Sequence, residues 1–415
     1  MFERNDGIRA PLNNKRSTRL LDIESGGALG DETFVWGEQW VIGSEPDGSM
    51  SALDMRKHSF RPVCTQAEID RIFDPKDATD HLLALRGNYI VDHMRIFRYF
   101  LRRFRAQRAG YSLERNFPSH HYAAYLKTLP VADRQRLTAV AYGDVFTAEA
   151  DGEIFNSPFG PIVTISRSIK YFLEYGGLAL RRLHRHIPID VRFRALIIAL
   201  RVMFGHESMD FEVDPRGVLS KRLLFEIRDP IELQLQFIVG HEFAHYLLGH
   251  LSSDKVHASQ LRFASHPSSS PELAKVYSVS QAEELAADLA SITLPQVGDQ
   301  KRAELLNATL IWFGLVELYQ HASDVVCPKP SWKESHPSAR DRHLHLLKNV
   351  ETRYLSDLTM VSDSIVHFVE LLKPVLSEYL SLHVDVFEHH GSIYLSDEPN
   401  SRWRGPKLVD RVDYY

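Results

Sequence analysis

The string His241-Glu242-Phe243-Ala244-His245 holds the side chains best suited to metal chemistry in this sequence. Two histidines four residues apart project from the same face of a helix and can bind one ion. A carboxylate next to the first histidine can accept a proton from a water molecule that the metal activates. The spacing therefore predicts a zinc site on a helix, with His241 and His245 as ligands and Glu242 as the catalytic base.

A zinc ion held by two histidines in this way needs a third protein ligand, which leaves the fourth position for water. Glu284 and Asp288 lie one turn apart and share a face of a predicted helix. We expect Glu284 to bind the ion and Asp288 to accept a hydrogen bond from the other ring nitrogen of a ligand histidine. Glu283 is the competing ligand, but no carboxylate follows it four residues later, and it suits a helix cap. One Zn²⁺ per chain is the expected cofactor.

The helix that carries the two histidines has clear signals at both ends. Asp229 is a good N-terminal cap, Pro230 suits the first turn, and Glu232 completes the spacing of a capping box. Gly249 stands where such a helix would end, because glycine readily adopts the conformation that follows a last turn. We therefore expect a helix over residues 229–250.

The glutamate ligand belongs to a second helix. Ser280 and Glu283 have the spacing of a capping box, and the helix is expected to run to about Pro295. A third helix, over about 299–321, is apolar on most sides and should be buried. Between the two ligand-bearing helices, the composition of residues 252–277 predicts a connection with little regular structure, long enough to act as a lid.

The rest of the chain divides into regions of different composition. Residues 1–60 are rich in Gly, Ser, Asn and charge and predict a partly flexible extension, with one strand-like stretch over 33–42. We expect a helical region over 61–145, the domain of the zinc site over 146–350, and a C-terminal helix with a loosely packed tail over 351–415. The expected fold class is α+β and mainly helical, with a small sheet.

One predicted helix of the N-terminal region carries a basic stripe. Apolar residues recur at helical spacing over 94–104, and four arginines follow the same spacing on the opposite side: Arg95, Arg98, Arg102 and Arg105. The stripe is typical of the solvated face of a core helix, and the alternative is a surface for a partner helix or nucleic acid. The formal net charge of −5 gives no general reason to expect nucleic acid or an acidic membrane as a partner.

The chain has 415 residues and only two cysteines, Cys64 and Cys327. Two distant cysteines make neither a disulfide framework nor a thiolate zinc site, and they favour a reducing compartment. The N-terminal residues contain no apolar segment of the kind found in secretory signals, and the apolar runs are too short to span a bilayer. We therefore expect a cytoplasmic protein without a membrane span.

The two metal motifs, HEFAH and ELAAD, together resemble the pattern HExxH…ExxxD of the gluzincin metallopeptidases. The distance of 39 residues from His245 to Glu284 suits the family of HtpX and the CAAX-prenyl endopeptidases within that clan. Residues 156–164, which precede a predicted helix, are similar to the edge strand ahead of the zinc helix in that family. The resemblance covers about residues 150–350 and implies a zincin-like core.

The resemblance also implies roles for residues outside the zinc motifs. Residues 335–342 resemble the family's downstream His-Pro segment, which places His336 near the cleft, either as a catalytic stabiliser of the transition state or as a helix cap. An extended substrate would add to the edge strand, so Gly160, Ile162 and Thr164 are expected to bind the substrate through their backbone.

This chain departs from the family in lacking transmembrane helices and in having a long helical insertion before the zinc helix. A second resemblance, on fewer residues, is to Lit, a soluble bacterial phage-exclusion peptidase with an HExxH motif. Both imply a zinc-dependent endopeptidase that hydrolyses peptide bonds of a protein or peptide substrate. The alternative is a catalytically silent zincin-like regulatory or binding protein, although a purely structural zinc site would not need Glu242.

Overall fold

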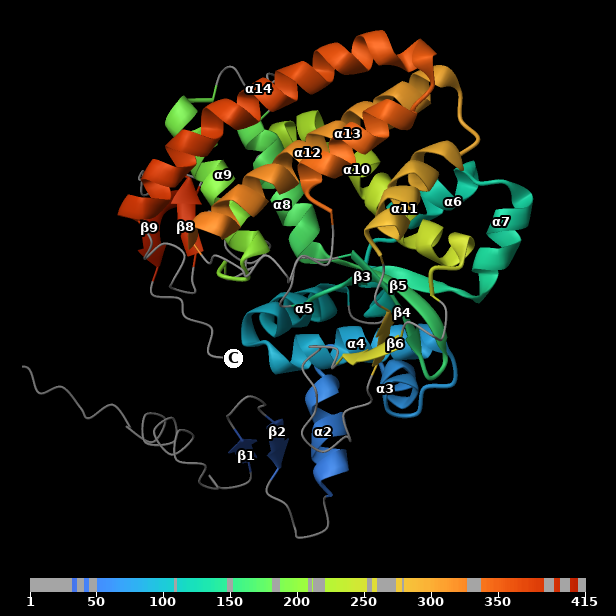
Figure 1. Cartoon of the computed structure of the whole chain (residues 1–415). Coiled ribbons are helices and arrows are strands. Elements are labelled where there is room, and N and C mark those ends of the chain that lie inside the picture. The colour runs from blue at the N-terminus through green and yellow to red at the C-terminus, as the bar shows by residue number, and fades with distance from the viewer. Residues whose placement is uncertain are drawn as a thin grey trace, which may run out of the picture.

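The computed structural model describes residues 32–35, 41–44, 51–107, 110–147, 152–180, 187–207, 211, 221–251, 256–259, 274–277, 280–326, 337–383, 392–395 and 404–409. In this part of the chain helices predominate, and a five-stranded sheet lies between the N-terminal helices and a larger helical layer (Figure 1). The prediction of a mainly helical α+β fold is confirmed.

The N-terminal helices enclose an aromatic core of their own. They are α2 (Ala52–Phe60), α3 (Gln66–Phe73), α4 (Ala78–Asp92), α5 (Met94–Gln107) and the short 3-10 helix η2 (Glu114–Asn116). Phe60, Phe100 and Phe117 are buried in this core. On the side of α5 that faces away from this core, the stripe arginines Arg98, Arg102 and Arg105 are exposed, as expected of a solvated face.

The start of this helical region differs from the prediction. Helix α2 falls within the expected flexible extension, yet Phe60 is fully buried and Arg56 pairs with Asp92 of α4 at 2.5 Å. The packed region therefore begins at about Ser51, whose side chain caps α2. Before it, the expected strand-like stretch consists of two antiparallel strands, β1 (Glu32–Val35) and β2 (Val41–Ser44).

The central sheet contains strands from two distant parts of the chain. Its strands lie in the order β3-β5-β4-β7-β6. They are β3 (Ala141–Val145), β4 (Gly152–Ser157), β5 (Gly160–Ser166), β6 (Val256–Ser259) and β7 (Ala274–Tyr277). Strands β6 and β7 belong to the segment expected to have little regular structure, so that expectation is wrong for these residues. The rest of the expected lid, residues 252–255 and 260–273, lies outside the described ranges.

The expectation that residues 160–166 form an edge strand is also wrong. Strand β5 pairs with β3 on one side and with β4 on the other, so Ile162 lies opposite both Ala141 and Phe155. Its run of apolar residues is typical of a strand buried on both faces rather than of an edge. Gly160, Ile162 and Thr164 therefore offer no free edge to which a substrate strand could add.

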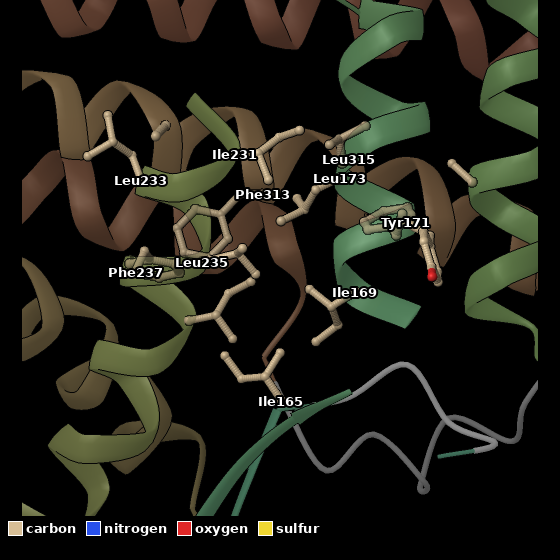
Figure 2. Packing of buried hydrophobic residues seen from close by; sticks show 14 of the residues in the cluster. Ile165, Ile169, Tyr171, Leu173, Ile231, Leu233, Leu235, Phe237, Phe313 and Leu315 are labelled. Carbon is tan, nitrogen blue, oxygen red and sulfur yellow. The ribbon is translucent and has the colours of Figure 1, made fainter. Parts of the chain in front are cut away.

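Helix α4 covers one face of the sheet, and the helices of the larger layer pack on the opposite face. Its elements are α6 (His120–Thr128), α7 (Val131–Arg136), η3 (Leu137–Ala139), α8 (Arg167–Leu180), α9 (Ile189–Met203), α10 (Lys221–Leu248), α11 (Gln281–Thr293), α12 (Asp299–Val326), α13 (Ala339–Asn349) and α14 (Thr352–Leu382). Figure 2 shows the core where Ile165 of β5 meets Leu173 of α8, Phe237 of α10 and Phe313 of α12.

Helix α10 begins earlier than its sequence signals indicate. It starts at Lys221, so Asp229 is not its N-cap and Pro230 lies inside the helix. An interior proline removes one hydrogen bond and costs about 3 kcal/mol. The helix continues nevertheless because Ile231, Leu235 and Phe237 are buried in the main core. Its end agrees with the prediction, since Gly249 has a φ of +75°.

The C-terminal region begins with the expected long helix, α14. Beyond it, β8 (Ser392–Leu395) and β9 (Arg404–Val409) form an antiparallel pair, and Ile393 is buried in the main core. This part of the expected tail is therefore packed, and the remainder lies outside the described residues. Across the described ranges, none of the helices combines the length and the apolar character that crossing a lipid bilayer requires.

Helix α6 packs closely on helix α10 at Gly240. A Cβ atom at Gly240 would lie 2.5 Å from ring carbons of Tyr125, which is buried. The Tyr125 hydroxyl donates a hydrogen bond of 3.1 Å to the Ser291 carbonyl of α11, so the ring is held in place. Helices α6, α10 and α11 therefore depend on a glycine beside His241.

Gly240→Ala should destabilise the protein. Overpacking of a well-filled core costs about 1–3 kcal/mol, which exceeds the gain of about 1 kcal/mol from replacing a helical glycine by alanine. Urea unfolding measures the difference. Gly298→Ala is the matched control, because no heavy atom lies within 4 Å of a Cβ there. A Gly240→Ala protein as stable as the wild type would contradict this packing.

Candidate metal centre

Helices α10 and α11 bring three potential ligand atoms together. The Nε2 atoms of His241 and His245 are 3.0 Å apart, and the two carboxylate oxygens of Glu284 lie 3.3 and 3.5 Å from them. Tetrahedral zinc with bonds of about 2.0–2.1 Å places its ligand atoms about 3.3 Å from one another. The separations of these three groups therefore fit a zinc ion, and the pairing expected from the sequence is present in the fold.

The two helices can approach this closely because small residues line their contact. Ala244 of α10 and Ala287 of α11 are fully buried against each other, and Ala290 extends the contact by one turn. On α11, the capping box of Ser280 and Glu283 is complete, so the helix starts as predicted. The Glu283 carboxylate accepts a hydrogen bond from the Ser280 backbone N–H in this cap, whereas Glu284 faces the histidines.

Asp288 holds His241 in the orientation that metal binding requires. Its Oδ1 atom lies 2.9 Å from His241 Nδ1, so the Nε2 atom of the ring is turned toward His245 and Glu284. A carboxylate on the far nitrogen fixes the tautomer and raises the basicity of a ligand histidine. The sequence-based role of Asp288 is supported by this contact.

Arg342 of α13 completes the arrangement from the other side. Its guanidinium contacts both carboxylate oxygens of Asp288, at 2.5 and 2.7 Å, and lies 3.5 Å from His241 Nδ1. It also stacks over the Phe313 ring of α12 at 5.3 Å. Such a two-point contact fixes a carboxylate more firmly than a single hydrogen bond. Asp288 is thereby clamped between α10 and α13.

His245 has a different partner, supplied by the end of its own helix. The His250 backbone N–H donates to the His245 carbonyl at 3.0 Å, and that of Gly249 donates to Tyr246 at 3.2 Å. This hydrogen-bond pair is the Schellman arrangement, which turns the chain back over the last helical turn. The turn brings His250 Nδ1 to 2.9 Å from His245 Nδ1. His250 is therefore buried and holds the His245 ring through its Nδ1 atom.

Glu242 lies on the side of the site that faces strand β4. A Cβ atom at Gly152 would lie 3.3 Å from Glu242 Oε1 and 3.0 Å from Ile238. Only a residue without a side chain leaves this much room for the glutamate. Gly152, at the start of β4, therefore sets the position of the carboxylate that the sequence assigns as the base.

The site buries more negative than positive charge. Glu242, Glu284 and Asp288 are each at least 93% buried, and Arg342 is the one arginine in contact with them among the described residues. In their ionised forms the three carboxylates carry two more charges than the guanidinium balances. Buried charge is tolerated only when it is compensated. One divalent cation bound here would compensate the remaining two negative charges.

The pKa of His241 reflects the same excess of negative charge. Burial disfavours a charged imidazole, but hydrogen bonds with Asp288 and Glu284 outweigh burial and raise the pKa of His241. Burial and the neighbouring His241 lower the pKa of His245. Burial alone would raise the pKa of Asp288, but Arg342 holds it below its usual value. The carboxylates beside His241 thus favour a positive charge at this ring.

The remaining predicted site residues lie elsewhere. Ile162 packs toward α4, on the opposite face of the sheet from α10, and the alternation of a strand turns Gly160 and Thr164 the same way. His336 lies outside the described residues. Comparisons of the chain with protein-family models, with curated protein sequences and with solved structures gave no match. The interpretation of the site therefore rests on its geometry.

Asp288→Asn should weaken zinc binding about 10–100-fold, the usual size of such an effect. The amide keeps the shape of the side chain but loses the charge that makes His241 a strong ligand. Competition with a chromophoric zinc chelator measures the affinity. Asp324→Asn, at an exposed position of α12, is the control and should change nothing. Equal affinities for the two variants would remove Asp288 from the metal centre.

Arg342→Gln should also weaken zinc binding, by about tenfold or more, because Asp288 loses its clamp. Arg340→Gln on the same helix is the matched control, since Arg340 lies 3.9 Å from Glu317 and away from Asp288. The same chelator competition applies. If both arginine variants bind zinc as the wild type does, Arg342 serves packing only.

Proposed function

We propose that this chain is a zinc-dependent endopeptidase with a zincin-like core, in which His241, His245 and Glu284 hold one zinc ion. The observation that carries the proposal is the spacing of the three side chains: the two Nε2 atoms lie 3.0 Å apart, and each lies 3.3 or 3.5 Å from a carboxylate oxygen of Glu284. Glu242 occupies the adjacent helix position. Three protein ligands are typical of catalytic zinc, whereas structural zinc has four. Hydrolysis of a peptide bond, as opposed to another acyl group, follows from the resemblance to gluzincins.

When bound, zinc would polarise the scissile carbonyl and lower the pKa of a water molecule. Glu242 accepts the proton of the attacking water and passes it to the leaving amine. Its position supports this role, because Gly152 leaves space beside the carboxylate. His241 and His245 must stay neutral at Nε2 to bind the metal, and Asp288 and His250 hold their other nitrogens.

The charge balance favours a catalytic role over a silent binding protein. The ligands His241, His245 and Glu284, with Asp288 to orient His241, would suffice to hold a metal ion, yet Glu242 adds a further buried carboxylate. Burying an extra carboxylate has a cost in stability. We infer that the buried Glu242 carboxylate is present, despite this cost, because it transfers a proton. Cys64, the usual kind of ligand for structural zinc, lies in the separate N-terminal core.

Glu242→Gln should retain the fold and one zinc ion while peptide hydrolysis falls by about 10²–10⁴-fold, the usual contribution of a general base. The amide matches the carboxylate in size but cannot accept the proton. A proteome-wide comparison of new protein termini, in cells expressing either form, measures the activity and identifies substrates.

The control for this experiment is Glu283→Gln, a change at a half-buried position of α11 that preserves the capping box, because glutamine also serves at that position. Cells with this variant should yield the wild-type set of termini. Termini that persist unchanged with Glu242→Gln would exclude Glu242 as the base. Absence of any termini specific to the wild type would favour the silent alternative.

A further inference from the structure

A second cluster of metal-ligating side chains lies where α6 meets α10. One nitrogen each from His120 and His121 and one carboxylate oxygen of Glu232 all lie within 4.8 Å of one another. His120 Nε2 is 2.9 Å from Glu232 Oε2, and its side chain is 68% exposed, so the cluster is open to solvent on that side. Among the described residues, this is the one such group apart from the zinc site.

His121 is oriented as metal-binding histidines are. Its side chain is 2% exposed, and its Nε2 atom lies 2.9 Å from Asp144 Oδ1 on strand β3. The backbone of Asp144 is held in turn, because its main-chain carbonyl oxygen accepts a hydrogen bond of 2.8 Å from the buried Arg86. A carboxylate on one ring nitrogen leaves the other with a free lone pair. That other nitrogen, Nδ1, is buried and has no hydrogen-bond partner.

A buried nitrogen without a partner is costly in a folded protein and calls for a ligand. Solvent does not explain it, because Nδ1 itself is not accessible at the surface. His120 and Glu232, the other members of the cluster, lie 2.9 Å from each other. A cation bound among the three side chains would contact this pair and His121 at once. Two imidazoles and one carboxylate are ligands that suit Zn²⁺ and similar divalent transition metals.

We propose that His120, His121 and Glu232 form a second binding site for a divalent transition metal, separate from the proposed zinc centre. The two sites share helix α10, on which Glu232 precedes His241 by nine residues, or about 14 Å along the helix axis. With solvent completing its coordination, the second site binds its ion more weakly than the buried centre.

Metal at this site would fasten α6 to the zinc helix. Farther along α6, Tyr125 packs on Gly240 and donates a hydrogen bond to Ser291 of α11. Helix α6 thus contacts both helices that supply the ligands of the first site. A bound ion at the start of α6 fixes that helix in place and stabilises the folded chain by mass action.

The test counts metal in the full-length protein after equilibrium dialysis against free zinc from nanomolar to about 100 µM. The wild type should bind two ions per chain in two separate steps. His120→Ala changes an exposed residue and should weaken the second step about tenfold or more, with the first step unchanged. His121→Ala should abolish the second step. His245→Ala should lose the first step and keep the second.

The control is His367→Ala, an exposed histidine of α14 far from either cluster in sequence, and it should keep both steps. One ion per chain in the wild type over the whole range would overturn the proposal. So would a second ion that survives His120→Ala and His121→Ala together. Because the first step depends on His245 and the second on His121, failure of the proposed peptidase centre is distinguishable from failure of this site.

Discussion

Three carboxyl groups, those of Glu242, Glu284 and Asp288, are buried beside two histidines, and Arg342 is the one arginine in contact with them among the described residues. This imbalance is the constraint on which the rest of the site depends. Carboxylates removed from water need compensating charge at short range. Arg342 supplies one positive charge, and the ligand groups have the spacing expected around a tetrahedral ion, so a divalent metal would supply the remaining compensation.

The fold meets this constraint through close helix contacts. Alanines let α11 approach α10 until Glu284 reaches the histidines, and the Gly249 turn brings His250 back onto His245. Glycines at 152 and 240 admit the Glu242 carboxylate and the Tyr125 ring. The zinc helix itself continues through Pro230 because its apolar face is anchored in the main core. Packing thus decides where local signals conflict.

The local part of the site could be predicted from the sequence. Helical spacing places His241 beside His245 and Glu284 on the same face as Asp288, and the capping box identifies the start of α11. The partners that come from far along the chain could not be predicted in this way. Arg342 reaches Asp288 across 54 residues, and no periodicity signals that contact. The place of β5 inside the sheet could not be predicted for the same reason, since its pairing on both sides depends on β3 and β4 together.

The central claim is that His241, His245 and Glu284 hold a zinc ion. Diffraction from crystals of the zinc-loaded protein, measured on both sides of the zinc absorption edge, tests it most directly. The account predicts an anomalous peak about 2.0–2.2 Å from both Nε2 atoms and from a Glu284 oxygen, the usual zinc–ligand distances. Crystals loaded with zinc that show no peak between these three side chains, or a peak bound by Asp288 instead of Glu284, would contradict it.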